Sequence, residues 1–379
     1  MRILFVLPRM VSGGIERVTL TLAAEFIKQG FSCALALRHS TGEFLSEAEQ
    51  LMPVYELAPA GLHQFIPSLS KLIKEWQPTH VITAFHDIAF LTLLSMRLAA
   101  SCAHLIHGAH NSHDKASARP GIIGKLRYFL ERHLAAFIYK RANSIVAVSQ
   151  GVMQEITSDF HIPSKRIAVI YNPVQCQASP PESRARISDI THRPVKLMAL
   201  GRLAHQKGFD VLIEAMSLLD TPRSWSLDIY GSGPERNNLQ AAIDRSGLNA
   251  RIDLKGHTNT PLDEMEGADL FILPSRHEGL GIVLVEAMSC GTQIVATDCP
   301  HGPREILVDG ALGQLVPTES AKHLAKAIET VLEGRQWILP ELLIARSVDF
   351  QPKAAAKAWL DWISREDTHQ DAMGTHNTF

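Results

Sequence analysis

Two glutamates stand eight residues apart in the segment RHEGLGIVLVEAMSCG, residues 276–291. The segment follows the apolar run Leu270–Leu273 and becomes apolar again at helical spacing, which predicts a strand, a turn and a helix. Glu278 then lies at the carboxyl edge of a parallel sheet, where open α/β folds bind ligands. Glu286 would stand about 12 Å further on if the whole stretch were helical. A retaining hydrolase needs carboxylates ~5–5.5 Å apart. Glu278 and Glu286 are too far apart for that role and better suit two acceptors of hydrogen bonds from opposite ends of an elongated ligand.

The same segment carries Gly279 and Gly281 just before the helical pattern begins. Glycine lets the backbone approach a ligand closely, and the amides at a helix start stabilise anions. The segment therefore combines two hydrogen-bond acceptors with backbone donors for an anion.

A second segment, GRLAHQKG (residues 201–208), places two cations five residues apart directly after the apolar run Lys196–Leu200. Its position after a strand brings it to the same sheet edge as the glutamate segment. Arg202 can bind phosphate oxygens bidentately and Lys207 adds a point charge, so the two predict a clamp for a diphosphate. The alternative is a solvated loop with a helix-capping glycine, and the two glutamates in the same half of the chain favour the clamp.

A third segment, SGGIER, begins at Ser12 after the first apolar run. Gly13 and Gly14 offer a turn without side chains that suits a phosphate or a sugar. A tight connection between a strand and a helix explains these glycines nearly as well, so both interpretations stay open.

These segments need two parallel α/β sheets to position them, and short apolar runs that alternate with helical patterns predict both. A helix is expected at Ile15–Gln29, and another after Gly208. The strands expected in the first half are Ile3–Leu7, Cys33–Leu37, His80–Ala84, His104–Gly108, Ser144–Val148 and Ile167–Ile170. Those in the second half are Lys196–Leu200, Ser226–Tyr230, Ile252–Lys255, Leu270–Leu273, Gln293–Ala296 and Gln314–Val316.

The pattern predicts a first domain at residues 1–173, a proline-containing linker at 174–194 and a second domain at 195–353. The helix expected at 354–364 carries Trp359 and Trp362, which predicts that it packs back on the first domain. The polar tail, 365–379, is expected to be disordered.

Composition favours an ordinary globular protein: 379 residues, of which 46% are hydrophobic and 20% charged. The five cysteines are scattered and read as reduced thiols. No segment predicts a membrane span or a secretory signal, so a cytoplasmic location is expected.

Residues 1–172 hold 17 basic and 12 acidic residues, a net charge of +5, and the remainder of the chain carries a net charge of −7. The basic half could face an anionic acceptor or membrane, or the imbalance could be chance variation.

The three segments, taken from the amino end of the chain to the carboxyl end, resemble in type and order those of the retaining glycosyltransferases of family 4, also called glycosyl transferases group 1. Glu278 and Glu286 reproduce the E-x7-E motif of the family. Residues 231–235, GSGPE, resemble its G-x-G-P-E turn, and the YNP at 171–173 resembles its domain-junction asparagine. The resemblance covers nearly the whole chain. It implies the α/β GT-B fold, in which two Rossmann-like, doubly wound domains face each other across a cleft.

The resemblance also implies roles for matching positions. Arg202 and Lys207 would bind the donor diphosphate and stabilise the leaving group, while Glu278 would contact the transferred sugar and Glu286 the ribose. The residues whose backbone or position would support the donor are Gly13, Gly14, Asn172, Gly201, Gly231, Gly279, Leu280 and Gly281.

The family places a histidine at the end of a strand in the first domain, near the reacting sugar. The segment LIHGAHN at 105–111 offers His107 and His110. His110, which precedes Asn111, fits that position better, although a structural role for either histidine stays open.

The function implied is metal-independent transfer of a hexose or N-acetylhexosamine, with UDP the expected nucleotide, to a glycan or lipid-linked glycan in bacterial lipopolysaccharide, O-antigen or capsule synthesis. The chain has no D-x-D motif, no P-loop and no recognisable metal-ligand spacing, so no metal, cofactor or nucleic acid is expected. Alternatives are a UDP-sugar 2-epimerase, a phosphorylase-like enzyme and a non-catalytic two-lobed sugar-binding protein.

Residues 124–141 combine basic and apolar side chains on one helical pattern. The favoured interpretation is a core-facing helix with a solvated basic side. The alternative is a contact with the cytoplasmic face of the inner membrane, as in a peripheral membrane protein.

Overall fold

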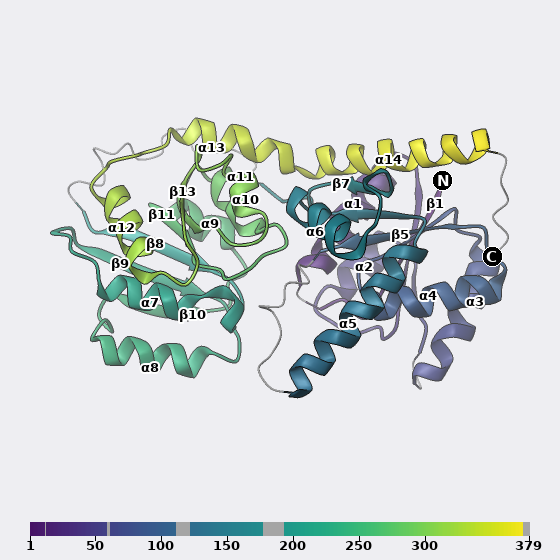
Figure 1. Cartoon of the computed structure of the whole chain (residues 1–379), viewed down its shortest axis with the longest axis horizontal. Coiled ribbons are helices and arrows are strands. Elements are labelled where there is room, and N and C mark those ends of the chain that lie inside the picture. Colours follow the sequence, from purple (N-terminus) through teal and green to yellow (C-terminus); the bar gives the residue numbers. More distant parts are fainter. Residues whose placement is uncertain (12, 59–60, 111–121, 177–192, 374–379) are drawn as a thin grey trace. The chain divides into compact units, whose positions relative to one another are not determined.

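The structure, a computed structural model, describes residues 1–11, 13–58, 61–110, 122–176 and 193–373. The chain divides into two compact units (Figure 1). The first unit comprises Met1–Pro173 and Pro352–Phe379, and the second comprises Val174–Gln351.

The described residues of the first unit form a seven-stranded parallel sheet in the order β3-β2-β1-β4-β5-β6-β7. Its strands are β1 Arg2–Leu7, β2 Ser32–Leu37, β3 Val54–Glu56, β4 His80–Thr83, β5 His104–Ala109, β6 Ser144–Ala147 and β7 Ile167–Val169. Its helices are α1 Gly14–Lys28, α2 Leu45–Leu51, α3 Phe65–Trp76, α4 His86–Ala99, α5 Ile122–Arg141, α6 Gln150–Phe160 and α14 Pro352–Met373, with 3-10 turns η1 Leu62–Gln64 and η3 Ser164–Arg166.

Helices cover both faces of this sheet because alternate strand residues point to opposite sides. Leu4 and Val6 of β1 pack in one apolar cluster with residues of α3 and α4. Phe5 points the other way and stacks on Phe26 of α1, with ring centroids 6.4 Å apart. Helix α14 packs against α1 of the same unit. A sheet buried on both faces needs nearly continuous apolar strands, which the sequence supplies.

The described residues of the second unit form a six-stranded parallel sheet in the order β10-β9-β8-β11-β12-β13. Its strands are β8 Val195–Leu200, β9 Trp225–Tyr230, β10 Ile252–Gly256, β11 Leu270–Leu273, β12 Gln293–Thr297 and β13 Gln314–Val316. Its helices are α7 Phe209–Ser217, α8 Arg236–Ser246, α9 Pro261–Gly267, α10 Ile282–Ser289, α11 Pro303–Ile306, α12 Ala321–Leu332 and α13 Pro340–Ser347, with 3-10 turns η5 His205–Lys207 and η6 Val348–Phe350.

The predicted α/β class with two Rossmann-like sheets is confirmed, and every predicted strand is present with its ends moved by at most one residue. The sequence missed β3, Val54–Glu56, because three residues are too few to show alternation. Residues 177–192, most of the predicted linker, lie outside the described residues. Helix α14 extends to Met373, into the tail for which the sequence predicts disorder, and residues 374–379 are not described.

The favoured interpretation of residues 124–141 is also only partly correct. They lie in the predicted helix, α5, and Ile138 and Tyr139 are fully buried. Several of its large apolar side chains are exposed instead, with Leu130 59% and Phe129 55% exposed. Among the residues that the structure describes, no helix is long and apolar enough to cross a membrane.

The turn that follows β9 contains a glycine, Gly231, that lies very close to a neighbouring loop. Gly231 has a φ of 134°, and a Cβ built there would lie 1.9 Å from the carbonyl oxygen of Gly201. Gly247, which ends α8 with a φ of 69°, has open space around it. Both alanine variants lose the freedom of glycine at positive φ, but only Gly231→Ala adds a collision.

Gly231→Ala is therefore expected to lower the free energy of unfolding by about 1–3 kcal/mol more than Gly247→Ala. Urea denaturation of both variants measures the difference. Equal losses would show that the chain near Gly231 relaxes at no cost.

Candidate active site

The sheet order of the second unit brings its two motif segments together. Strand β8 pairs directly with β11, while the chain between them forms β9 and β10 on the other side of β8. The strand order therefore reverses between β8 and β11, and the connections from their carboxyl ends leave in opposite directions. Such a switch point opens a crevice for ligands in parallel α/β sheets. Residues 201–208 and 274–281 are the loops that follow these two strands.

These two loops touch along their backbones. Gly208, with a φ of 65°, lies so close to β11 that a Cβ there would be 2.0 Å from the carbonyl oxygen of Pro274. The amide of Arg276 donates to the carbonyl of Gln206 at 2.8 Å, and Gln206 Nε2 donates to the carbonyl of His277 at 2.9 Å. The cationic loop is thereby fixed on the glutamate loop.

The side chain of Arg276 strengthens this connection. Its guanidinium donates to both carboxylate oxygens of Asp210, at 2.8 and 2.7 Å, and to the carbonyl of His205 at 2.5 Å. It also pairs with Glu319. The hydrogen bond with Asp210, followed by that with Glu319, holds the pKa of Arg276 above its ordinary value. Bidentate pairing fixes the orientation of both partners, so Arg276 anchors the turn that carries Lys207.

Lys207 and Glu278 form a buried ion pair at the crevice. Lys207 Nζ lies 2.5 Å from Glu278 Oε1, and the two side chains are 18% and 8% exposed. Ser275 Oγ donates to the same oxygen at 2.6 Å. The stem of Lys207 lies against Gly201, where an added Cβ would be 3.4 Å from its Cδ. The structure therefore brings these predicted residues into direct contact.

Arg202, the other predicted cation, differs from Lys207 in its exposure to solvent. It follows Gly201 on the same loop and is exposed. Within the part of the chain that the structure describes, its guanidinium makes no hydrogen bond or ion pair. Its charge is therefore available for an anionic ligand, whereas that of Lys207 is already shared with Glu278.

Glu286 lies on α10, partly buried. Burial raises the pKa of its carboxyl from 4.5 to about 7. No hydrogen bond or ion pair to this carboxyl occurs among the described residues, although a buried polar group normally has a partner. A hydroxyl donor from a ligand would supply one.

The start of α10 is shaped by glycines and by the loop that follows β12. Gly281 caps the helix with a φ of 86°, Leu280 is buried and Gly279 is partly exposed. A Cβ on Gly302 would lie 1.9 Å from the carbonyl oxygen of Leu280, so the loop after β12 packs tightly here. These predicted donor residues, with Gly231 after β9, all lie at the carboxyl edge of the second sheet.

The remaining predicted residues belong to the first unit. His110 directly follows β5, and its ring folds back over Gly108, where an added Cβ would be 2.8 Å from Nε2. Burial lowers the pKa of His110 to about 4, so the ring is neutral near pH 7. His110 and Asn172 line the same small cavity, together with Thr83 and Trp359. A neutral imidazole can exchange hydrogen bonds with a sugar but brings no positive charge.

His107 is completely buried on β5. Its Nδ1 lies 3.0 Å from Thr83 Oγ1, and its ring centroid is 4.9 Å from that of His86. It also packs against Tyr139, which belongs to α5. These contacts describe a core histidine, and the choice of His110 as the site candidate stays a prediction.

Gly13 and Gly14 lie at the start of α1, after β1. Because β1 and β4 are neighbours in the sheet, this is the switch point of the first unit. Glu16 folds its carboxyl over Gly13, so that an added Cβ there would lie 2.3 Å from Oε2. Burial raises the pKa of Glu16. A side chain at position 13 would therefore displace the carboxyl of Glu16, a contact that the sequence did not reveal.

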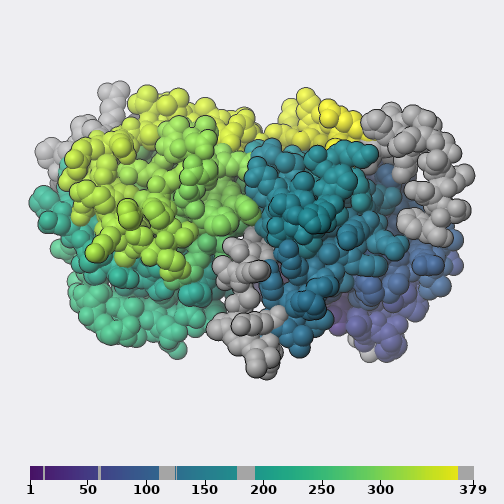
Figure 2. Space-filling model, viewed as in Figure 1, coloured from purple at the N-terminus to yellow at the C-terminus, as the bar shows by residue number. Residues whose placement is uncertain are grey.

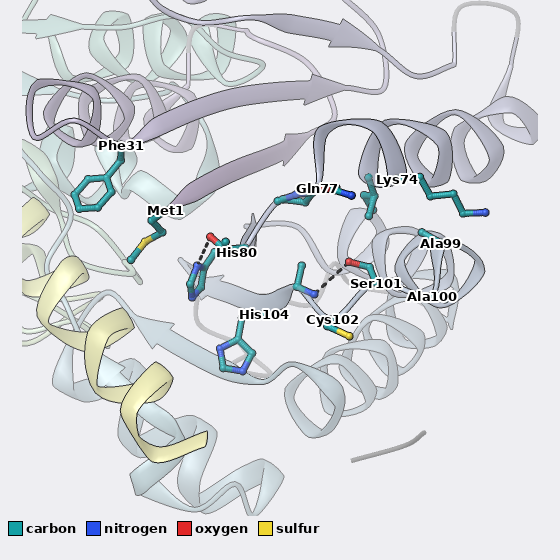
Figure 3. A pocket seen from close by; sticks show the side chains of 14 residues that line it. Met1, Phe31, Lys74, Gln77, His80, Ala99, Ala100, Ser101, Cys102 and His104 are labelled. Carbon is teal, nitrogen blue, oxygen red and sulfur yellow. Dashed lines mark hydrogen bonds between the residues drawn. The ribbon is translucent and has the colours of Figure 1, made fainter. Parts of the chain in front are cut away.

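A further cavity lies away from these residues. It measures about 840 Å³ and opens at the amino edge of the first sheet, where His80 and His104 begin β4 and β5 (Figure 3). Lys74 and Cys102 also line it. Ligand sites of parallel sheets lie at the opposite, carboxyl edge, and no predicted site residue contributes to this cavity.

The sequence missed the residues that hold the site together. Ser275 and Arg276 flank the recognised motif but lie outside its pattern. Asp210 and Glu319 are 66 and 43 residues from Arg276, and no local signal connects them to it. The described residues include no group of three or more side chains that could hold a metal ion.

Two Rossmann-like units in one chain are the architecture of the GT-B class. The family model described as "Glycosyltransferase Family 4" matches residues 12–178, and that described as "Glycosyl transferases group 1" matches residues 182–346. The chain belongs to the family 4 glycosyltransferases, also described as group 1.

Known proteins agree with this assignment. The chain is 28% identical over 204 residues to N-acetylgalactosamine-N,N'-diacetylbacillosaminyl-diphospho-undecaprenol 4-alpha-N-acetylgalactosaminyltransferase of Campylobacter jejuni, and the match covers 54% of each protein. The chain thus spans about half the length of that relative. It is 24% identical to amylovoran biosynthesis glycosyltransferase AmsD of Erwinia amylovora, over 93% of this chain and 96% of the relative.

The fold is also that of Anabaena Alr3699/HepE, whose crystal structure is a complex with UDP. That structure superposes with a TM-score of 0.80 at 20% identity, and the match covers 96% of this chain and all of the other. At this identity the similarity establishes the fold.

The raised pKa of Glu286 makes the free energy of unfolding depend on pH. Folding raises this pKa from 4.5 to about 7, so the unfolded chain ionises the carboxyl at a lower pH than the folded chain does. In this window the folded state binds the extra proton, and the free energy of unfolding falls as the pH rises from about 4.5 to about 7.

Glu286→Gln removes the buried charge. We expect this variant to be more stable than the wild type by about 1–3 kcal/mol at pH 8 and equally stable at pH 4. Urea denaturation at both pH values measures this, and Glu214→Gln, which changes an exposed carboxyl on α7, is the matched control. A gain of the same size at both pH values would contradict the assigned cause.

Proposed function

We propose that this protein is a retaining, metal-independent glycosyltransferase that moves a hexose or N-acetylhexosamine from a UDP-sugar to a glycan or lipid-linked glycan. The observation that carries the proposal is the buried Lys207–Glu278 pair, which stands at the switch point of the second sheet beside the exposed Arg202. A cation and an acceptor at one crevice fit a ligand with a phosphate at one end and sugar hydroxyls beside it.

The donor diphosphate would bind Arg202 and Lys207. When the bond between the sugar and the phosphate breaks, negative charge grows on the leaving diphosphate. Fixed cations lower the energy of this state, and they do so with little reorganisation because Arg276 already anchors their loop. This electrostatic role is the one that a divalent metal fills in other enzymes.

Glu278 would change partners when the donor binds. Its Oε1 accepts from both Lys207 and Ser275. As Lys207 turns to the phosphate, the carboxylate is left to accept from hydroxyls of the sugar. Without a ligand, Lys207 and Glu278 would neutralise each other. With the donor bound, Lys207 would contact the phosphate and Glu278 the sugar.

Glu286 would accept hydrogen bonds from the ribose hydroxyls. Its raised pKa follows from burial without a partner, and the ribose would provide the missing donors. Gly201, Gly231, Gly279, Leu280 and Gly281 would bring backbone groups close to the rest of the donor. From the first unit, His110, Asn172, Gly13 and Gly14 would contact the sugar or the acceptor.

UDP as the nucleotide is supported by the complex formed by the structural relative Alr3699/HepE. An acceptor on an envelope or extracellular polysaccharide is supported by the names of AmsD and of the Campylobacter enzyme, which acts on a diphospho-undecaprenol glycan. Retention of the donor configuration follows the family resemblance.

The reaction is tested by incubating the protein with a panel of UDP-, GDP- and dTDP-sugars. We expect calorimetric binding of UDP that persists in EDTA, and donor hydrolysis with at least one UDP-sugar. Loss of UDP binding in EDTA would overturn metal independence. Conversion of a free UDP-sugar to its epimer, with no acceptor present, would identify an epimerase instead.

Arg202→Ala tests the diphosphate clamp most cleanly, because Arg202 is exposed and we expect its loss to leave the fold intact. Removing a preorganised electrostatic donor costs about 10²–10³ in kcat, and we expect a loss of that size with an unchanged thermal midpoint. Lys207→Ala is expected to cause a similar loss, but with a lower midpoint because it leaves the buried Glu278 without its cation.

Lys322→Ala is the control for charge, since it removes an exposed lysine from α12 of the same unit. Its turnover should match that of the wild type. If folded Arg202→Ala turned over the donor at the rate of this control, Arg202 would be a solvated loop cation and not part of the clamp.

A further inference from the structure

A buried threonine stands at the carboxyl end of β12, beside the loops that form the candidate site. Thr297 is the last residue of β12 and is only 1% exposed. Strand β12 lies between β11 and β13 in the sheet, and the segment that follows it, yellow-green in Figure 2, covers much of the second unit on the face shown there. A hydroxyl in this position needs a hydrogen-bond partner inside the protein.

The hydroxyl of Thr297 finds its partner at the end of the neighbouring strand. Its Oγ1 donates to the carbonyl oxygen of Ser275 at 2.5 Å and lies 3.3 Å from that of Leu273. Leu273 and Ala296 form the last pair of the backbone ladder between β11 and β12. The side chain of Thr297 therefore joins the two segments just beyond the point where this ladder ends.

Ser275 connects this contact to the carboxylate of Glu278. Ser275 is fully buried, and its Oγ donates to Glu278 Oε1 at 2.6 Å. A hydrogen bond requires both of its heavy atoms to be correctly placed. The position of the Ser275 main chain, which Thr297 fixes, therefore helps to decide where the Glu278 carboxylate is held.

The loop after β12 also fixes the main chain of Glu278. The amide of Glu278 donates to the carbonyl of Pro300 at 2.7 Å, and the amide of His301 donates to the carbonyl of Glu278 at 3.0 Å. With both of its backbone polar groups held, Glu278 keeps its freedom mainly in the side-chain torsions. The hydrogen bond from Ser275 restricts these torsions.

This arrangement leaves one carboxylate oxygen of Glu278 for a ligand. Within the part of the chain that the structure describes, the contacts of this carboxylate with Lys207 and Ser275 both use Oε1. An ionised carboxylate accepts hydrogen bonds at both oxygens. Holding Oε1 therefore sets the direction in which Oε2 is presented to a sugar hydroxyl.

We propose that Thr297 is a positioning residue for glycosyl transfer, which orients the Glu278 carboxylate through Ser275. The inference rests on the proposed contact between Glu278 and the transferred sugar, and it assigns no contact with the donor to Thr297. A displacement of about 1 Å in a reacting geometry can cost about 10²-fold in rate. A hydroxyl that only orients Glu278 can therefore affect turnover strongly.

Thr297→Val tests the proposal, because valine keeps the branched shape of threonine and loses the hydroxyl. We expect kcat with the preferred UDP-sugar to fall about tenfold or more. The calorimetric Kd for UDP, which carries no sugar, should stay within about twofold of the wild-type value. Thr297→Ser keeps the hydroxyl and should recover most of the lost turnover, although serine fills the space less well than valine does.

Thr292→Val is the matched control. Thr292 directly precedes β12, is fully buried, and donates from Oγ1 to the carbonyl oxygen of Met265 at 2.9 Å. It therefore loses the same kind of buried hydrogen bond at the opposite, amino end of the strand. We expect the two valine variants to lower the thermal midpoint by similar amounts, and only Thr297→Val to lower kcat.

A double-mutant cycle tests whether the two hydroxyls act along one path. Ser275→Ala should lower kcat at least as far as Thr297→Val does. Adding Thr297→Val to Ser275→Ala should then cause little further loss, because no Ser275 hydroxyl remains to be positioned. Losses that multiply would show that Thr297 acts independently of Ser275 and would overturn the proposed connection.

Crystal structures of the two valine variants test the positioning step without any need for activity. In Thr297→Val we expect Ser275 Oγ to lie more than about 3.5 Å from Glu278 Oε1, beyond hydrogen-bond distance, and in Thr292→Val we expect the contact to persist. An unchanged contact in Thr297→Val, or a kcat equal to that of Thr292→Val, would overturn the proposal. If the wild type turned over no nucleotide sugar, the proposed reaction would fail, and the two structures would still decide whether Thr297 positions Glu278.

Discussion

The buried contact between Lys207 and Glu278 sets the requirements that the rest of the second unit meets. An ammonium and a carboxylate withdrawn from water lose hydration, and their attraction offsets that loss only when the geometry is close and the remaining lone pairs are satisfied. Ser275 supplies the additional hydrogen bond. Gly208 allows the loops to touch, and Arg276 holds the turn in place through Asp210. The parallel sheet, whose order reverses between β8 and β11, presents both loops at one edge.

The same edge contains a group that folding leaves unsatisfied. Glu286 is withdrawn from water without a partner in the described structure, and its pKa of about 7 reflects the cost of charging it there. A carboxyl in this condition destabilises the protein at neutral pH, and it gains the most when a ligand brings hydroxyl donors. Site residues that are poorly satisfied in the free protein are consistent with a crevice organised for binding.

The first unit has a different character. His110 is neutral because its ring is buried, and its neighbours in the small cavity are largely apolar.

The amino-acid sequence by itself determined which segments become strands and helices, because apolar periodicity and glycine placement act over a few residues. It also predicted Arg202, Lys207 and Glu278 as candidate donor residues, since each lies in a segment that follows a predicted strand at the edge where parallel sheets bind ligands. Glu286 was predicted from its spacing to Glu278. Only the tertiary structure decided their partners: Lys207 reaches Glu278 across 71 residues of sequence, and Arg276 reaches Asp210 across 66. The tertiary packing also decided which side chains are buried. The apolar pattern of α5 was equally consistent with a core helix and a surface helix, and the desolvation of Glu286 depends on atoms from many distant segments, so no local pattern could reveal either.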